Sequence, residues 1–140
     1  MNADGEAKGE AGHGLHFMTV TAAAHAIAHK ELSPVELMKA HLARIEKLQP
    51  TLNAFIRLDA EGALKAAHAA EVEAMTGRLR GPLHGIPVGI KDIIDVAGLP
   101  TTCHSKILQD NVATADAVVV SKLRAAGAIV VGKQIGRAHV

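Results

Sequence analysis

The stretch that decides the fold runs from Gly81 to Ser105 and reads GPLHGIPVGIKDIIDVAGLPTTCHS. Near its centre, Lys91 and Asp92 are the charged residues of an otherwise apolar run that spans residues 86–94. A lysine inside a buried strand is costly, because its charge must be paired or its proton lost. Either this strand lies at the edge of a sheet, where Lys91 reaches water, or the lysine takes part in chemistry.

Both interpretations of Lys91 stay open on the residues alone. As a structural residue, Lys91 would be a surface lysine on an edge strand or an ion-pair partner of Asp92 or Asp95. As a functional residue, it would be desolvated, which lowers the pKa of a lysine from about 10.4 towards neutrality. A neutral lysine can take a proton from a serine hydroxyl, as in Ser–Lys catalytic systems.

The pattern along the chain predicts helices that precede and separate strands, which is typical of an α/β fold. Helices are expected over residues 19–29, from Ser33 to a stop before Pro50, over 59–75, and from Thr114 or Asp116 to 126. Ser33 is the expected N-cap, with Glu36 completing a capping box. Strands are expected over residues 53–57, 88–96 and 128–132. The second of these strands is apolar on both faces, which predicts a central position in a covered sheet.

Composition and charge exclude several classes of protein. The 140 residues suffice for about one domain, and the formal net charge of +1 gives no bulk attraction to nucleic acid or to an anionic membrane. Two phenylalanines, with no tryptophan or tyrosine, argue against stacking on single-stranded nucleic acid. No apolar run approaches a membrane span, and no secretory signal precedes the first helix. A cytoplasmic protein without a membrane or nucleic-acid partner is therefore expected.

One motif nearly matches the phosphate-binding loop GxxxxGK[ST]. The segment Gly127–Gln134 reads GAIVVGKQ, so its last position lacks the hydroxyl that would hold Mg²⁺. Its four intervening residues form an apolar strand pattern and not a loop whose amides face phosphate. Nucleotide binding is therefore rejected for this segment.

Histidines and the single cysteine suggest no metal or disulfide site. His25 and His29 are four residues apart on one predicted helix, but no third ligand is evident, so structural histidines are expected. Cys103 is expected to be a small buried apolar residue. A nucleophilic role for Cys103 would need a nearby histidine, and only the adjacent His104 is visible. The roles of Cys103 and His104 stay unassigned.

Five stretches together resemble the amidase signature family. They are GPLHGIPVGIKD at residues 81–92, DVAGLPTT at 95–102, DAVVV through LRAAGA to GK at 116–133, LSPVEL at 32–37 and LNAFI at 52–56. The resemblance is collinear from about residue 18 to residue 133. His104 departs from it, because many members have glycine before the serine of this loop.

The resemblance implies an α/β fold around a large mixed sheet and a reaction that hydrolyses a carboxamide through an acyl-enzyme. A lysine, a serine in a cis peptide and a nucleophilic serine form the triad of this family, and Lys91 takes the lysine role. Both serines belong to a Gly/Ser-rich segment downstream of residue 140, since no Gly-Gly-Ser-Ser-Gly-like run occurs here. The resemblance implies a small-molecule amide substrate and no metal or organic cofactor.

Three alternatives accompany this interpretation. The parent protein could instead be the amidase subunit of a tRNA-dependent amidotransferase. The 140-residue chain could be an inactive piece, because neither serine is present. A homodimer is a further option that the sequence does not decide.

We expect three segments along the chain. Residues 1–17 form a flexible tail, residues 18–134 the N-terminal portion of an amidase domain, and residues 135–140 a non-native tail. The last seven residues, QIGRAHV, can be encoded by CAG ATC GGA AGA GCA CAC GTC. From its second base this string reads like a sequencing adapter, so we interpret residues 135–140 as adapter carried into an assembly.

Overall fold

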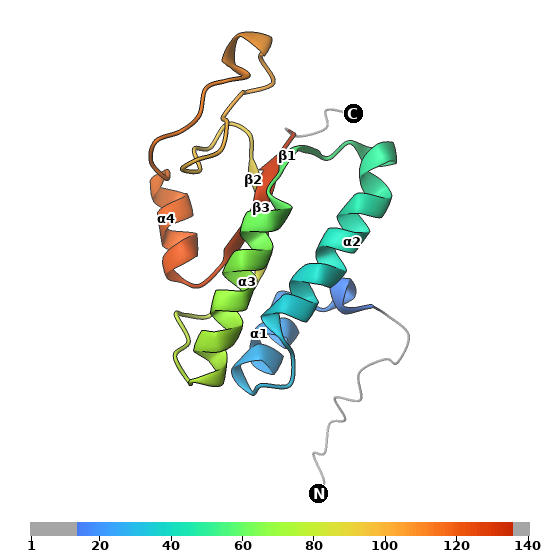
Figure 1. Ribbon diagram of the computed structural model, residues 1–140, viewed down its shortest axis with the longest axis vertical. Coiled ribbons are helices and arrows are strands. Elements are labelled where there is room, and N and C mark those ends of the chain that lie inside the picture. Colours follow the sequence, from blue (N-terminus) through green and yellow to red (C-terminus); the bar gives the residue numbers. More distant parts are fainter. Residues whose placement is uncertain (1–13, 136–140) are drawn as a thin grey trace, which may run out of the picture.

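The computed structural model describes residues 14–135, which form the mixed α/β arrangement that the sequence predicts (Figure 1). The helices are α1 (Val20–Ala28), α2 (Pro34–Leu52), α3 (Ala60–Met75) and α4 (Val118–Ala125), with short 3-10 helices η1 (Leu15–Phe17) and η2 (Lys106–Leu108). The strands are β1 (Phe55–Leu58), β2 (Pro87–Lys91) and β3 (Ile129–Gln134).

The three strands form one mixed sheet in the order β1-β3-β2. Strand β1 is antiparallel to β3, whereas β2 is parallel to β3 and pairs Lys91 with Gln134. Parallel neighbours need a crossover connection, and the chain between β2 and β3 contains α4. The carboxyl ends of β2 and β3 therefore meet at the same edge of the sheet, where Lys91 lies.

Alternate residues of β3 face opposite layers of helices, since successive side chains of a strand point to opposite faces. Ile129 and Val131 pack with buried residues of α2 and α3, whereas Val130 packs with Val120 of α4. Figure 1 shows the same arrangement, with α4 on the other side of the sheet from α2 and α3. Burial on both faces explains the continuous apolar run of β3.

Strand β2 corrects the prediction for residues 88–96. It ends at Lys91, so the predicted extent to residue 96 is wrong, and among the three described strands it lies at the edge of the sheet instead of the predicted centre. The amide of Ile94 donates to the carbonyl of Lys91 at 3.0 Å, which turns the chain away from the sheet. Val96, predicted to be in this strand, is fully buried beside Val120 after the turn. The apolar pattern continued past the turn because the turn is also buried.

Helix α2 begins as predicted and ends later than predicted. The hydroxyl of Ser33 accepts hydrogen bonds from the amides of Val35 and Glu36, at 3.0 and 3.2 Å, and donates to the carboxylate of Glu71. The helix runs through Pro50 to Leu52, and the C-cap residue Asn53 has a left-handed φ of 47°. A proline removes one helical hydrogen bond, and Pro50 lies near enough to the end of α2 for the last turn to form.

Helix α4 does not open at Thr114 or Asp116. It begins at Val118 after Ala117, which gives no side-chain cap. The carboxylate of Asp116 instead accepts from the amide of Ala97 at 2.7 Å and pairs with Arg124 at 3.0 Å. Asp116 therefore ties the turn after β2 to α4.

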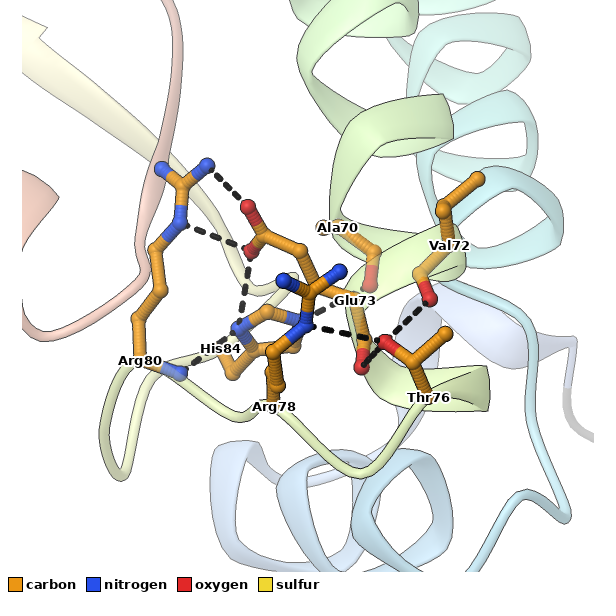
Figure 2. Close-up of polar contacts among 7 residues, drawn as sticks. All are labelled: Ala70, Val72, Glu73, Thr76, Arg78, Arg80 and His84. Atoms are coloured by element: carbon orange, nitrogen blue, oxygen red, sulfur yellow. Dashed lines mark hydrogen bonds and ion pairs between the residues drawn. The ribbon is translucent and has the colours of Figure 1, made fainter.

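The loop between α3 and β2 is fixed by a buried histidine (Figure 2). His84 is 3% exposed; its Nδ1 accepts from the amide of Arg80 at 3.1 Å, and its Nε2 donates to the carbonyl of Ala70 at 2.8 Å. Arg80 donates two hydrogen bonds to Glu73, at 2.8 and 2.7 Å. These hydrogen bonds lower the pKa of Glu73 below its usual value. The approach of the chain to β2 is thus held against α3.

The two ends of the chain lie partly outside the described residues. Leu15–Phe17, within the expected tail, form η1, and the guanidinium of Arg44 lies 4.6 Å from the ring centroid of Phe17. The amide of Ile135 donates to the carbonyl of Ala54 at 2.9 Å. Residues 1–13 and 136–140 are not described, so the proposed division of the chain stays a prediction. Among the described residues, no helix has the length and apolarity needed to cross a membrane.

Candidate functional site

Lys91 is the last residue of β2 and its side chain is exposed. Ile90 is buried against α4, and alternation along the strand turns Lys91 to the other side. Within the described residues its ammonium group makes no hydrogen bond or ion pair, so neither Asp92 nor Asp95 is its partner. Among the described strands Lys91 thus lies at the edge of the sheet, and the described residues leave its side chain exposed.

The buried ion pair of this region joins Asp92 to Lys133. Both side chains have no exposed surface, and Lys133 Nζ lies 3.3 Å from Asp92 Oδ1. Lys133 also donates to the carbonyl of Pro100 at 3.0 Å and to Thr101 Oγ1 at 2.9 Å. The three protons of the ammonium group can thus be matched with three oxygen acceptors, as a buried cation requires.

Asp92 is held in its charged form by its surroundings. Its Oδ1 accepts from the amide of Thr102 at 3.1 Å, and its Oδ2 accepts from the hydroxyl of Thr102. Burial raises the pKa of Asp92, but the hydrogen bonds from Thr102 and the ammonium of Lys133 outweigh it, so the net pKa lies below the ordinary value. Asp92 is therefore held as the anionic partner of Lys133.

The sequence does not predict the pair of Asp92 and Lys133, because Lys133 enters that reasoning only in the rejected phosphate loop and in the stretches that resemble the family. The sequence did contain a signal for this pair. Lys133 directly follows the apolar run Val130-Val131-Gly132, and a lysine buried at the end of such a strand needs a carboxylate partner. The cost of burying a lysine, considered as one alternative for Lys91, applies to Lys133 in the described residues.

The loop after β2 carries two consecutive left-handed residues. Cys103 has φ 48° and His104 has φ 61°, a conformation that residues other than glycine rarely adopt. The amide of Cys103 donates to the carbonyl of Asp92 at 3.0 Å, and the amide of His104 donates to Thr102 Oγ1 at 3.2 Å. Cys103 is exposed, so its expected burial is wrong. The left-handed turn places its side chain outside the core.

An open cavity of about 300 Å³ lies between β1 and this loop. Its lining comprises Ile56, Arg57, Pro100, Thr102, His104, Ser105, Lys106 and Gln109. Lys91 is not among them, but Thr102 connects the cavity wall to Asp92, the residue after Lys91.

Two other motifs of the sequence have structural roles. Gly127 has φ 96° and precedes β3, and residues 129–134 form a buried strand, which confirms the strand predicted for this segment. The rings of His25 and His29 stack at 4.0 Å, and His29 Nδ1 donates to the carbonyl of His25. Over residues 14–135, no group of three or more His, Cys, Asp or Glu side chains is placed to hold a metal ion.

Comparison with known families decides the relationship of this chain. A family model described as "Amidase" matches residues 36–134, which include Lys91, Asp92 and Lys133. The chain belongs to the amidase signature family.

Among the curated members of the amidase signature family, a glutamyl-tRNA(Gln) amidotransferase subunit of Chloroflexus aurantiacus is 48% identical over 119 residues. The match covers 85% of this chain and 24% of that protein. An acylamidase of Rhodococcus erythropolis is 40% identical over 119 residues, with 85% and 25% covered. The chain thus spans about a quarter of the length of the curated relatives that it matches.

Solved structures of amidases contain the same fold. Peptide amidase from Stenotrophomonas maltophilia has a TM-score of 0.78 at 40% identity, covering 84% of this chain and 24% of the other. A fatty acid amide hydrolase has a TM-score of 0.81 at 27% identity, covering 86% and 21%. The predicted α/β fold and family are confirmed, and the chain corresponds to about a quarter of an amidase structure.

Proposed function

We propose that the full-length protein containing this chain cleaves a carboxamide through an acyl-enzyme on a serine, with Lys91 as the proton shuttle. The observation that supports this most is the placement of Lys91. Its amine is exposed and unpaired among the described residues, at the end of a strand whose backbone is bonded to β3 and to the turn that follows. The lack of an ion-pair partner favours a shuttle, because an ion pair would hold the amine protonated. Under this proposal, the desolvation that makes Lys91 neutral comes from parts of the full-length protein outside the described residues.

The proposed proton path begins with neutral Lys91. Its Nζ takes a proton from a bridging serine, which takes one from the nucleophilic serine as that oxygen attacks the amide carbon. The C–N bond then breaks, and the proton returns by the same path to the leaving amine. Water attacks the acyl-enzyme with Lys91 again as base, which releases the acid and restores the serine.

This path uses no metal or organic cofactor. The substrate is a small-molecule amide, and the protein is cytoplasmic under the same proposal. The 140 residues contain no Gly/Ser-rich run with two serines. We therefore propose that the 140-residue chain alone is inactive, since removing a nucleophile costs several orders of magnitude in rate.

A second candidate has its own support. The 48% identity to the glutamyl-tRNA(Gln) amidotransferase subunit exceeds the 40% identity to the acylamidase over the same number of residues. In this candidate, the same chemistry releases ammonia from an amide donor and passes it to a partner subunit. Amide cleavage that rises only when a partner and charged tRNA are added would favour this candidate over a free-standing amidase.

Trapping the acyl-enzyme tests the proposal. The full-length protein is mixed with an aryl amide, quenched in acid, and digested for mass spectrometry. We expect release of the arylamine and an acyl group on one serine of a Gly/Ser-rich segment, with neither from the 140-residue chain. An adduct on Cys103, or turnover by the 140-residue chain, would contradict the proposal.

A further inference from the structure

We propose that Asp92 and Lys133 are positioning residues for Lys91, and that their buried ion pair fixes both the end of β2 and the loop over residues 100–104. The inference rests on the proposed function of Lys91. It assigns a role to two residues that do not themselves touch the substrate.

Asp92 is bonded through every polar group that it has. Its amide donates to the carbonyl of Gln134 at 2.9 Å, and its carbonyl accepts from the amide of Cys103 at 3.0 Å. Its two carboxylate oxygens accept from Thr102, and Oδ1 also faces Lys133. The peptide that joins Lys91 to Asp92 is therefore held between β3 and the loop, and the backbone of Lys91 cannot rotate without breaking these bonds.

Lys133, on the central strand β3, binds both Asp92 and the start of the loop. It pairs with Ile90 of β2 in the sheet register, and its side chain reaches past Asp92 to the carbonyl of Pro100 and the hydroxyl of Thr101. One ammonium group thus joins β3, the residue after Lys91 and the start of the loop.

The loop needs this support. Cys103 and His104 are both left-handed, and such strain persists only where the surrounding structure over-determines the backbone. Two of the bonds that hold them come from Asp92 and from Thr102, which itself binds Asp92. Thr102 and His104 line the open cavity, so the ion pair sets the wall of the cavity and the direction of Lys91 together.

Stability alone does not account for such a pair. Replacing a buried ion pair with apolar residues of similar volume is often neutral or stabilising, whereas removing one partner is costly. Two apolar side chains of similar volume would therefore stabilise the fold equally well if the role of the pair were purely structural. A positioning role would be lost with apolar side chains, because Thr102 would have no carboxylate to donate to and Lys133 would no longer donate to the loop.

The double variant Asp92→Leu/Lys133→Met separates these roles in the full-length protein. Thermal unfolding, kcat and KM are measured with one aryl amide, beside Asp95→Asn as a control that removes an exposed carboxylate of the same segment. We expect a melting temperature close to that of the wild type, a KM within about threefold, and a kcat lower by about 100-fold, the size of effect that a misplaced group gives. A folded double variant with kcat within about threefold of the wild type would overturn the inference.

Thr101→Val gives a milder test that remains decisive if the double variant does not fold. It removes one hydroxyl acceptor of Lys133 and keeps both charges. We expect kcat to fall about tenfold, the size expected from one hydrogen bond to a charged group. A folded Thr101→Val with unchanged kcat would count against positioning.

Lys91→Ala in the same series separates the positioning role from the proposed function. If Lys91→Ala abolishes turnover and the other variants keep it, the positioning role is wrong and the proposed function stands. If Lys91→Ala keeps full turnover, the proposed function is wrong and the positioning role falls with it.

Discussion

Gly127→Ala should destabilise the fold by two separable effects. Gly127 has φ 96°, and a Cβ added there would lie 2.5 Å from the Cα and 2.8 Å from the amide nitrogen of His84. Left-handed backbone costs a residue with a Cβ about 1–2 kcal/mol. Overlap with backbone atoms that must shift costs about 1–3 kcal/mol more. The free energy of unfolding should therefore fall by about 2–5 kcal/mol, the sum of these two ranges.

Gly77→Ala is the matched control for the first effect. Gly77 also has a left-handed φ, 75°, and follows a helix, but a Cβ there would meet nothing within 4 Å. We expect it to lose only the backbone part, about 1–2 kcal/mol. Both variants and the wild type are unfolded in urea and followed by circular dichroism. Equal losses for Gly127→Ala and Gly77→Ala would refute the steric argument, because the contact with His84 would then contribute nothing.

Three further predictions concern the cap of α2 and the buried pair. Ser33→Ala should lower the free energy of unfolding by about 1 kcal/mol, because two amides of α2 lose their acceptor, and urea unfolding checks this; no loss would mean that water replaces the cap. Lys133→Met should lower the free energy of unfolding by about 3–5 kcal/mol in the same assay, since the carboxylate of Asp92 stays buried without its counterion. A loss below about 1 kcal/mol would show that water reaches the carboxylate. Because the pKa of Asp92 is lower in the folded than in the unfolded state, its contribution is present above its unfolded pKa and is lost as the pH falls through its folded pKa. Acid titration of the wild type and Asp92→Asn should show a steeper loss in the wild type, and parallel curves would contradict this.

The fold was predictable where local chemistry and packing agree. Ser33 caps α2, the helix expected over residues 59–75 forms as α3, and the apolar run of β3 is buried on both faces, because each of these signals acts within a few residues. Lys91 was also selected from the sequence as a candidate site residue, because a lysine among apolar neighbours is costly to bury. Its role as a shuttle stays a prediction, since it came from the resemblance and not from its geometry.

The remaining features depend on contacts that are distant in sequence. Asp92 and Lys133 are 41 positions apart in the sequence, and Asp116 binds the amide of Ala97 instead of capping α4. Strand β2 ended early because a buried turn has the same apolar pattern as a buried strand. Cys103 is exposed because its backbone is left-handed, which no composition rule indicates.

The central claim is that Lys91 moves the proton in amide cleavage. Its most direct test is kcat/KM of the full-length protein for one aryl amide, compared between Lys91→Ala and Lys122→Ala, which removes an exposed lysine of α4. Loss of a general base predicts a fall of about 100- to 10,000-fold for Lys91→Ala and almost none for Lys122→Ala. A folded Lys91→Ala protein that keeps kcat/KM within about threefold of the wild type would contradict the account, since that loss is far below the range expected for a general base.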